Sequence, residues 1–238
     1  MPLSSKIINI GSKNFKNYKI IKIESGASTK KFYRITNNQI SYIITDFGLD
    51  KNEYFNHIKI YDLLKNINIS IPRIIEKYEN DNVIISEDLG DLRFDKILEK
   101  YDIKKLLKYS IDTLIEINNK ITFNSKSKLQ EYNFNIFKTE IIELTNFYFP
   151  YIGIKDKNLI DDFLFIWKKS YNKIDFNYKN FIHKDFNINN LILIPSNKGY
   201  LKCGVIDFQS AFWGESSWDL FSLLEDSRIM FNDEFNDY

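Results

Sequence analysis

The sequence predicts a two-lobed α+β protein. A five-stranded antiparallel sheet with one helix is expected first, and a mainly helical lobe that carries a β-hairpin is expected to follow. Three observations support this prediction: short alternating apolar runs in the first third of the chain, helical periodicity in the middle, and a polar loop followed by two short apolar runs near the end. With 238 residues, 44% of them hydrophobic, the chain can also form a sizeable core.

The composition argues against several classes of protein. Basic and acidic residues nearly balance, 33 against 32, so no electrostatic argument favours nucleic acid or an anionic membrane as the partner. No stretch approaches the roughly 20 apolar residues that span a bilayer, and no signal peptide is evident. The single cysteine, Cys203, excludes an intramolecular disulfide and a cysteine-built zinc site. We therefore expect a cytoplasmic protein, either a monomer or an oligomer of unknown size.

The first lobe is expected to span residues 1–88. Five short β-type runs separated by turns predict its strands: residues 18–24, 31–36, 40–45, 72–77 and 82–86. One helix is expected over residues 50–66, after the third strand, because Tyr54, Ile58 and Leu64 recur at helical spacing. Asp50 can serve as its N-cap, with Glu53 as the capping-box partner.

The second lobe is expected to span residues 89–238, with the boundary near Glu87 to Gly90. An apolar stripe from Ile103 to Ile117 predicts one helix, and two more are expected over residues 134–149 and 157–171. We expect Pro150 to stop the first of these two helices. The chain ends about thirty residues after Asp207, so this lobe is expected to be a shortened or truncated one.

The most informative segment runs from His183 to Asp207. A polar loop (HKDFNINN) leads into one apolar run at residues 191–194, and a turn ending at Gly199 leads into a second at residues 201–206. The two runs predict an antiparallel hairpin, so Asn190 and Asp207 should lie together at one end of it, beside the loop that carries Asp185. Glycine suits this turn because it adopts positive φ without strain.

Two carboxylates and an amide at one point suit phosphoryl transfer. Asp207 and the side-chain carbonyl of Asn190 are the hard oxygen ligands that Mg²⁺ prefers. Asp185 can accept the hydrogen of an attacking hydroxyl, and His183 can brace the loop. The pattern H-x-D-x-x-x-x-N, followed after a hairpin by Asp-Phe, is that of a kinase catalytic loop and its metal-binding aspartate.

Four further segments, with these motifs, resemble the aminoglycoside phosphotransferase and choline kinase superfamily, which has the protein-kinase-like fold. They are residues 26–34 (GASTKKFYR), 71–74 (IPRI), 86–91 (SEDLGD) and 205–224, which contains VIDFQSA and WDLFSLL. The likeness runs over nearly the whole chain. Within the superfamily it is to the bacterial anomeric sugar kinases that phosphorylate N-acetylmuramate and N-acetylglucosamine in cell-wall recycling.

The resemblance implies an ATP- and Mg²⁺-dependent kinase of a small molecule that carries a hydroxyl group. It implies Asp185 as the catalytic base, in a loop with His183, and Asn190 and Asp207 as the Mg²⁺ ligands. Asp219 would brace the catalytic loop. The residues implied to contact the nucleotide are Gly26, Ala27, Ser28 and Thr29 in a loop, and the backbone of Glu87, Asp88 and Leu89.

Two departures from the family pattern leave alternatives open. Protein kinases hold the α- and β-phosphates with a lysine on the third strand, and residues 41–46 (SYIITD) contain none. Lys30 or Lys31 on the neighbouring strand can substitute, or metal and backbone can hold the phosphates. The nucleotide loop also contains a single glycine, Gly26. A pseudokinase that binds nucleotide without catalysis is therefore one alternative.

The acceptor is open as well. An aminoglycoside, choline, ethanolamine or homoserine kinase would need acidic residues in the acceptor pocket, for which Glu215, Glu225 and Asp226 are candidates. Trp218 can stack on a sugar ring, although core packing explains it equally well. We expect His57 to be an ordinary helix residue and Cys203 to be a structural thiol.

Overall fold

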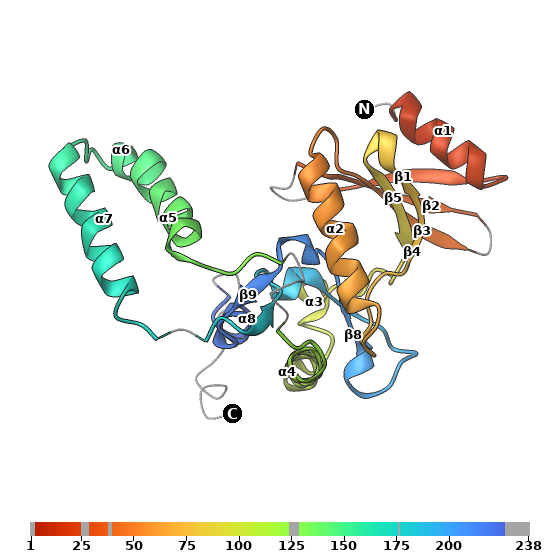
Figure 1. Ribbon diagram of the computed structural model, residues 1–238. Coiled ribbons are helices and arrows are strands. Elements are labelled where there is room, and N and C mark those ends of the chain that lie inside the picture. The colour runs from red at the N-terminus through yellow and green to blue at the C-terminus, as the bar shows by residue number, and fades with distance from the viewer. Residues whose placement is uncertain (1–2, 25–28, 38–39, 124–128, 176, 227–238) are drawn as a thin grey trace.

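The computed structural model describes residues 3–24, 29–37, 40–123, 129–175 and 177–226. It has the protein-kinase-like α+β architecture that the sequence predicts. A five-stranded antiparallel sheet with its helices lies beside a mainly helical part (Figure 1). Short strands in the second part carry the segment that the sequence marks as catalytic.

All neighbouring strands of the sheet are antiparallel, and each lies within two residues of its predicted bounds. In spatial order the strands are β1 (Lys19–Ile23), β2 (Lys31–Thr36), β3 (Ser41–Asp46), β5 (Val83–Glu87) and β4 (Ile74–Tyr78). Helix α2 (Lys51–Leu64) follows β3, as predicted. The Asp50 carboxylate caps it by accepting a 2.9 Å hydrogen bond from the Glu53 N–H.

Two helices cover opposite faces of this sheet. Ile7 of α1 (Ser5–Asn14) packs in one cluster with Val83 of β5, and Tyr54 of α2 packs in another cluster with Ile84. Because successive residues of a strand point to opposite faces, α1 and α2 lie on opposite sides of the sheet. Helix α1 has no counterpart in the sequence prediction.

The second part of the chain is mainly helical. Its helices are α3 (Phe94–Ile97), α4 (Ile103–Lys120), α5 (Phe134–Glu143), α6 (Phe149–Tyr151), α7 (Lys157–Tyr171) and α8 (Ser217–Leu224). The predicted stripe of α4 packs into the core around Leu107 and Leu114. Helices α5 to α7 form a helical hairpin that extends away from the sheet (Figure 1).

The prediction that Pro150 stops its helix is wrong, because helical backbone continues to Tyr151. A π-helical turn (Leu144–Tyr148) precedes the proline, and the Phe149 N–H bonds to the Leu144 carbonyl. Proline has no N–H to donate, and its ring clashes with the carbonyl four residues earlier. The wider π turn lets Pro150 sit at the start of a new helical turn, α6, where a missing N–H costs little.

Four short strands complete the second part. Strand β7 (Leu191–Leu193) pairs with β8 (Cys203–Val205), and β6 (Asn180–Ile182) pairs with β9 (Phe212–Gly214). Single 3₁₀ turns lie between or beside strands: η1 (Glu79–Asp81), η3 (Ile188–Asn190), η4 (Gly199–Lys202) and η5 (Phe208–Ser210). Along the described stretches, no helix combines the length and the apolar character that crossing a membrane requires.

Candidate functional site

The predicted hairpin is confirmed, and it brings the two expected metal ligands to the same end. Leu191 pairs with Val205, and the Ile206 N–H donates a 3.0 Å hydrogen bond to the carbonyl of Asn190. Asn190 therefore lies beside the residue that precedes Asp207. Gly199 has the positive φ expected of this turn, +54°. Strand β8 begins two residues later than predicted, because the first two residues of the predicted strand belong to the 3₁₀ turn η4.

The loop before the hairpin closes on the backbone of Asp185. The Asn190 side-chain N–H₂ donates to the Asp185 carbonyl at 2.9 Å, and so does the Asn187 N–H, also at 2.9 Å. These bonds fix the amide of Asn190 with its nitrogen toward the loop, which leaves its oxygen for a cation. Within the described residues, the Asp185 carboxylate has no hydrogen-bond or ion-pair partner. It is half-buried, so it remains available to a substrate hydroxyl.

Asp219 braces the catalytic loop from α8. Its two carboxylate oxygens accept hydrogen bonds from the N–H groups of His183 (2.7 Å) and Lys184 (3.0 Å). Lys184 has a φ of +81°, which is unfavourable for a residue with a side chain and persists where the surroundings impose it. Burial raises the pKa of Asp219 to about 7; the two N–H donors oppose this effect, whereas the charge of Asp185 adds to it.

His183 is buried and bonded to the backbone of the hairpin. It is 1% exposed, and its Nε2 lies 3.0 Å from the carbonyl of Ile206. Burial lowers its pKa, so the ring is neutral at physiological pH and Nε2–H donates this bond. His183 thus ties the start of the catalytic loop to the residue before Asp207, the bracing position that the sequence predicts.

Asp207 ends the hairpin in the left-handed conformation, with φ +64°. Its Oδ1 accepts a hydrogen bond from Gln209 Nε2 at 3.1 Å and forms an ion pair with Lys30. Burial by itself raises the pKa of Asp207, but the Lys30 ammonium and the Gln209 amide outweigh burial and hold that pKa below its usual range. Asp207 is therefore a carboxylate in the folded protein.

Lys30 is the functional candidate that sequence reasoning left undecided. Its Nζ contacts Asp207 and lies 3.2 Å from Oε1 of Glu53, in the first turn of α2. The side chain is 3% exposed, whereas its neighbour Lys31 points to solvent. Because Lys30 and Lys31 are neighbours in an extended segment, only one of them is expected to point into the protein. The sequence does not show which one.

His57 is on α2 as predicted, but it is more than an ordinary helix residue. Its ring stacks on Phe208 with the centroids 4.7 Å apart, directly after Asp207. Burial lowers the pKa of His57 to about 4, and the charge of Lys30 adds to this effect. A neutral His57 thus joins α2 to the segment that follows Asp207.

The predicted nucleotide contacts are only partly described. Gly26, Ala27 and Ser28 lie outside the described residues, and Thr29 is exposed directly before Lys30. Glu87, Asp88 and Leu89 lie at the end of β5, where the chain passes into the helical part.

The side chains at the end of β5 are ordered by specific contacts. The Asp88 carboxylate pairs with Arg34 Nε at 2.6 Å and accepts from the Gly90 N–H at 3.0 Å. The Leu89 side chain lies over Gly204 of β8, where an added Cβ would come within 2.8 Å of Leu89 Cδ1. The segment is therefore held against the hairpin and leaves room for no side chain at position 204.

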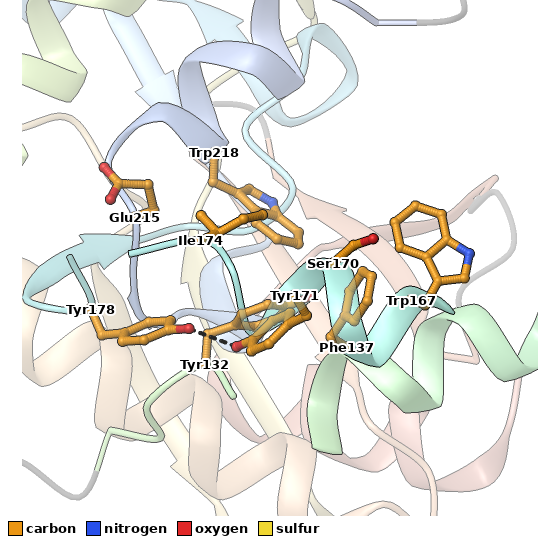
Figure 2. A pocket seen from close by; sticks show the side chains of 9 residues that line it. All are labelled: Tyr132, Phe137, Trp167, Ser170, Tyr171, Ile174, Tyr178, Glu215 and Trp218. Atoms are coloured by element: carbon orange, nitrogen blue, oxygen red, sulfur yellow. Dashed lines mark hydrogen bonds between the residues drawn. The ribbon is translucent and has the colours of Figure 1, made fainter. Parts of the chain in front are cut away.

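A cavity of about 150 Å³ lies beside the catalytic loop (Figure 2). Aromatic side chains from α5, α7 and α8 form most of its wall, and Glu215 supplies a carboxylate. Trp218, one wall of the cavity, donates a 3.1 Å hydrogen bond from Nε1 to the carbonyl of Lys184, next to Asp185. A cavity of this size holds roughly one six-membered ring.

The acidic candidates do not gather in this cavity. Glu215 lines it but already accepts a 3.0 Å hydrogen bond from the Asn177 N–H. Glu225 is exposed and Asp226 is buried, and neither lines the cavity. Trp213 is a core residue with 1% exposure, and burial raises the pKa of Cys203 to about 12, as expected of a structural thiol.

The residues at the end of the hairpin fit a magnesium ion shared with phosphate. Across the described ranges, no three His, Cys, Asp or Glu side chains gather into a metal-binding group. A group of three such side chains is not required, because Mg²⁺ is often held by one or two carboxylates together with substrate phosphates and water. Asp207 already accepts one cation, the Lys30 ammonium, and the Asn190 amide oxygen lies at the same end.

The proteins that this chain is similar to are phosphotransferases and kinases. Residues 178–238 match the model of a phosphotransferase enzyme family. The chain is 22% identical over 215 residues to an N-acetylmuramate/N-acetylglucosamine kinase of Pseudomonas aeruginosa, with 88% of the chain and 60% of the relative aligned. It is 25% identical over 220 residues to the protein of the same name from Neisseria meningitidis, with 88% and 62% aligned. The chain thus spans about 60% of the length of these relatives.

Solved structures show the same fold. An ADP-bound aminoglycoside phosphotransferase superposes with a TM-score of 0.70 at 18% identity, covering 98% of this chain and 79% of its own. A choline kinase of Streptococcus pneumoniae superposes with a TM-score of 0.69 at 17% identity, covering 98% and 77%. The predicted resemblance to the aminoglycoside phosphotransferase and choline kinase superfamily is confirmed, and so is the protein-kinase-like fold.

Proposed function

We propose that this chain is an ATP- and Mg²⁺-dependent phosphotransferase that phosphorylates a hydroxyl of an amino sugar such as N-acetylmuramate or N-acetylglucosamine. The observation that carries the proposal is the closed loop between Asp185 and Asn190, joined through the hairpin to Asp207. We assign nucleotide binding to residues 1–88, and the catalytic loop and metal ligands to residues 89–238. The names of the relatives agree with the sugar acceptor.

Each residue has a definite part in this reaction. Asp185 accepts the proton of the acceptor hydroxyl, whose oxygen forms a bond to the γ-phosphorus. The bond from that phosphorus to the β,γ-bridging oxygen breaks, and ADP leaves. Asp207 and Asn190 would hold Mg²⁺, which would supply neutralisation of the charge that develops on the phosphate oxygens. Asp219 and His183 hold the loop in the geometry that this transfer needs.

The cavity beside the loop favours a sugar over a polycationic acceptor such as an aminoglycoside. Aromatic faces suit the apolar side of a sugar ring, and the Trp218–Lys184 hydrogen bond keeps this wall next to the catalytic loop. A polycationic acceptor needs several carboxylates. Of the described acidic candidates Glu215, Glu225 and Asp226, only Glu215 lines the cavity, and a backbone N–H already occupies it.

A panel of acceptors tests the proposal. The purified 238-residue chain is incubated with ATP, Mg²⁺ and one acceptor at a time: N-acetylmuramate, N-acetylglucosamine, kanamycin, choline, ethanolamine or homoserine. ADP release should depend on an amino sugar. Turnover with only one of the other acceptors would replace the sugar assignment. Binding of ATP without turnover on any acceptor would support the pseudokinase alternative instead.

A further inference from the structure

The third strand of this sheet has no basic residue. Kinases of this fold place a lysine there, where it pairs with a glutamate of the following helix and holds the nucleotide phosphates. In β3 the side chain that faces α2 near the end of the strand is Thr45. It lies opposite Ile84, which packs with Tyr54 of α2. The fold therefore lacks its usual phosphate lysine at the usual strand.

Lys30, directly before the neighbouring strand β2, reaches the same face of the sheet. Phe32 of β2 lies directly opposite Thr45, so both side chains point to the α2 side of the sheet. Lys30 lies two residues before Phe32, and its Nζ is 5.8 Å from the centre of the Phe32 ring, which confirms the shared face. Lys30 therefore extends over the face of the sheet to which Phe32 and Thr45 also point.

One partner of Lys30, a glutamate of the following helix, is also the partner of the usual lysine. Its ammonium lies 3.2 Å from Glu53 of α2, the helix after the third strand, and also contacts Asp207. Burying an ammonium to 3% exposure is costly unless carboxylates pair with it, and two do. A lysine–glutamate pair is thus present here, with the lysine supplied by the residue directly before β2.

Lys31 does not fit this role. It is the first residue of β2 and lies opposite Asp46, so alternation turns its side chain to the face opposite that of Phe32. It is exposed, and among the described residues no ion pair joins it to Glu53 or Asp207. Lys31 is therefore a natural control for any experiment on Lys30.

We propose that Lys30 binds the α- and β-phosphates of the nucleoside triphosphate, in place of the missing third-strand lysine. The proposal rests on the function proposed above. Phosphate oxygens take over from Asp207 as partners of the ammonium, Glu53 continues to hold it, and the Asp207 carboxylate becomes available to the divalent cation.

Calorimetric binding of ATP and of adenosine tests this assignment. Lys30→Met should weaken ATP binding about 10- to 100-fold, because one hydrogen bond to a charged group is lost, and should leave adenosine binding unchanged. Lys31→Met should bind both ligands as the unaltered protein does. If the unaltered protein binds ATP and Lys30→Met binds it equally well, the assignment of Lys30 is wrong and the proposed function stands. If the unaltered protein does not bind ATP, both are wrong.

A labelling experiment avoids any dependence on the folding of the variant. An acyl phosphate of ATP places a reactive carbonyl beside the phosphates. A lysine there attacks the carbonyl carbon, becomes acylated and releases ATP. Mass spectrometry of the unaltered protein should find the acyl group on Lys30, and excess ATP should prevent the labelling. Labelling of Lys31 with Lys30 unmodified would overturn the assignment.

Discussion

The side-chain amide of Asn190 donates a 2.9 Å hydrogen bond to the backbone carbonyl of Asp185. This bond joins the residue expected to take the proton to a residue expected to hold the metal, and it orients the amide of Asn190. Its nitrogen is used inside the loop, so its oxygen is the atom left for a cation. One side chain thereby shapes the loop and supplies a ligand.

Asn190→Ala should remove both contributions. We expect the Mg²⁺ concentration for half-maximal turnover to rise about 10- to 100-fold, with a lower kcat at saturation. Turnover measured over a Mg²⁺ titration checks this. Asn189→Ala is the matched control, because Asn189 bonds within the loop through its backbone N–H. An unchanged Mg²⁺ dependence in Asn190→Ala would remove Asn190 from the metal site.

Gly204→Ala should weaken nucleotide binding through Leu89. The new methyl group would meet Leu89 Cδ1 at 2.8 Å and Ile194 Cδ1 at 3.0 Å, so the Leu89 side chain must move. We expect a loss of about 1–3 kcal/mol in unfolding free energy from overpacking, together with weaker adenosine binding by calorimetry.

Gly199→Ala separates the loss of unfolding free energy from the loss of nucleotide binding. Gly199 has a φ of +54° and open space around it, so alanine there strains the backbone without touching Leu89. It should cost about 1 kcal/mol in urea unfolding and leave adenosine affinity unchanged. If Gly204→Ala also leaves adenosine affinity unchanged, the predicted contact of the adenine with residues 87–89 loses its support.

His57 should make stability depend on pH. Its pKa is about 4 in the folded protein and about 6.5 in the unfolded chain. The unfolded chain therefore binds the extra proton first as the pH falls, and stability present above pH 6.5 is lost toward pH 4. The contribution is on the order of 2 kcal/mol.

His57→Gln removes this titration and keeps a polar side chain at the position. Urea unfolding at pH 7.5 and pH 4.5, in magnesium-free buffer, should show a smaller loss for the variant than for the unaltered protein. His183 titrates in both proteins, so the difference isolates His57. Equal losses in the two proteins would mean that His57 is protonated in the folded state.

Trp167→Ala tests the aromatic cavity as the acceptor site. Trp167 lines the cavity from α7 and contacts Phe137, with ring centroids 5.4 Å apart. Its loss should raise KM for the sugar about 2- to 10-fold, as expected for one aromatic contact, and leave KM for ATP unchanged. Phe165→Ala, an exposed position on the same helix, should change neither constant. An unchanged sugar KM would place the acceptor elsewhere.

The sequence predicts features that depend on neighbouring residues. The hairpin of β7 and β8 is one, because two short apolar runs joined by a tight turn have few alternatives, and the N-cap of α2 by Asp50 is another. The pairing of β6 with β9 was missed, since it joins residues some thirty positions apart in three-residue strands. Helix α1 was missed because its N-cap, Ser4, and its short apolar face give a weak local signal.

The sequence likewise predicts those parts of the candidate site that depend on neighbouring residues. Asp185, Asn190 and Asp207 lie in one local loop and hairpin, so their proximity follows from local geometry. The contact of Lys30 with Glu53 depends on how α2 packs on the sheet. Glu53 has an evident local role as the capping-box partner at the start of α2. Nothing in the spacing of the residues predicts that it also pairs with Lys30.

We propose above that the segment from His183 to Asp207 is a working phosphotransfer centre with Asp185 as its base. The most direct measurement is sugar-dependent ADP release by Asp185→Ala, compared with Asp161→Ala at an exposed position on α7. We predict that Asp185→Ala loses about 10²- to 10⁴-fold in kcat while its ATP affinity persists, and that Asp161→Ala keeps full activity. Undiminished turnover by Asp185→Ala would contradict the claim.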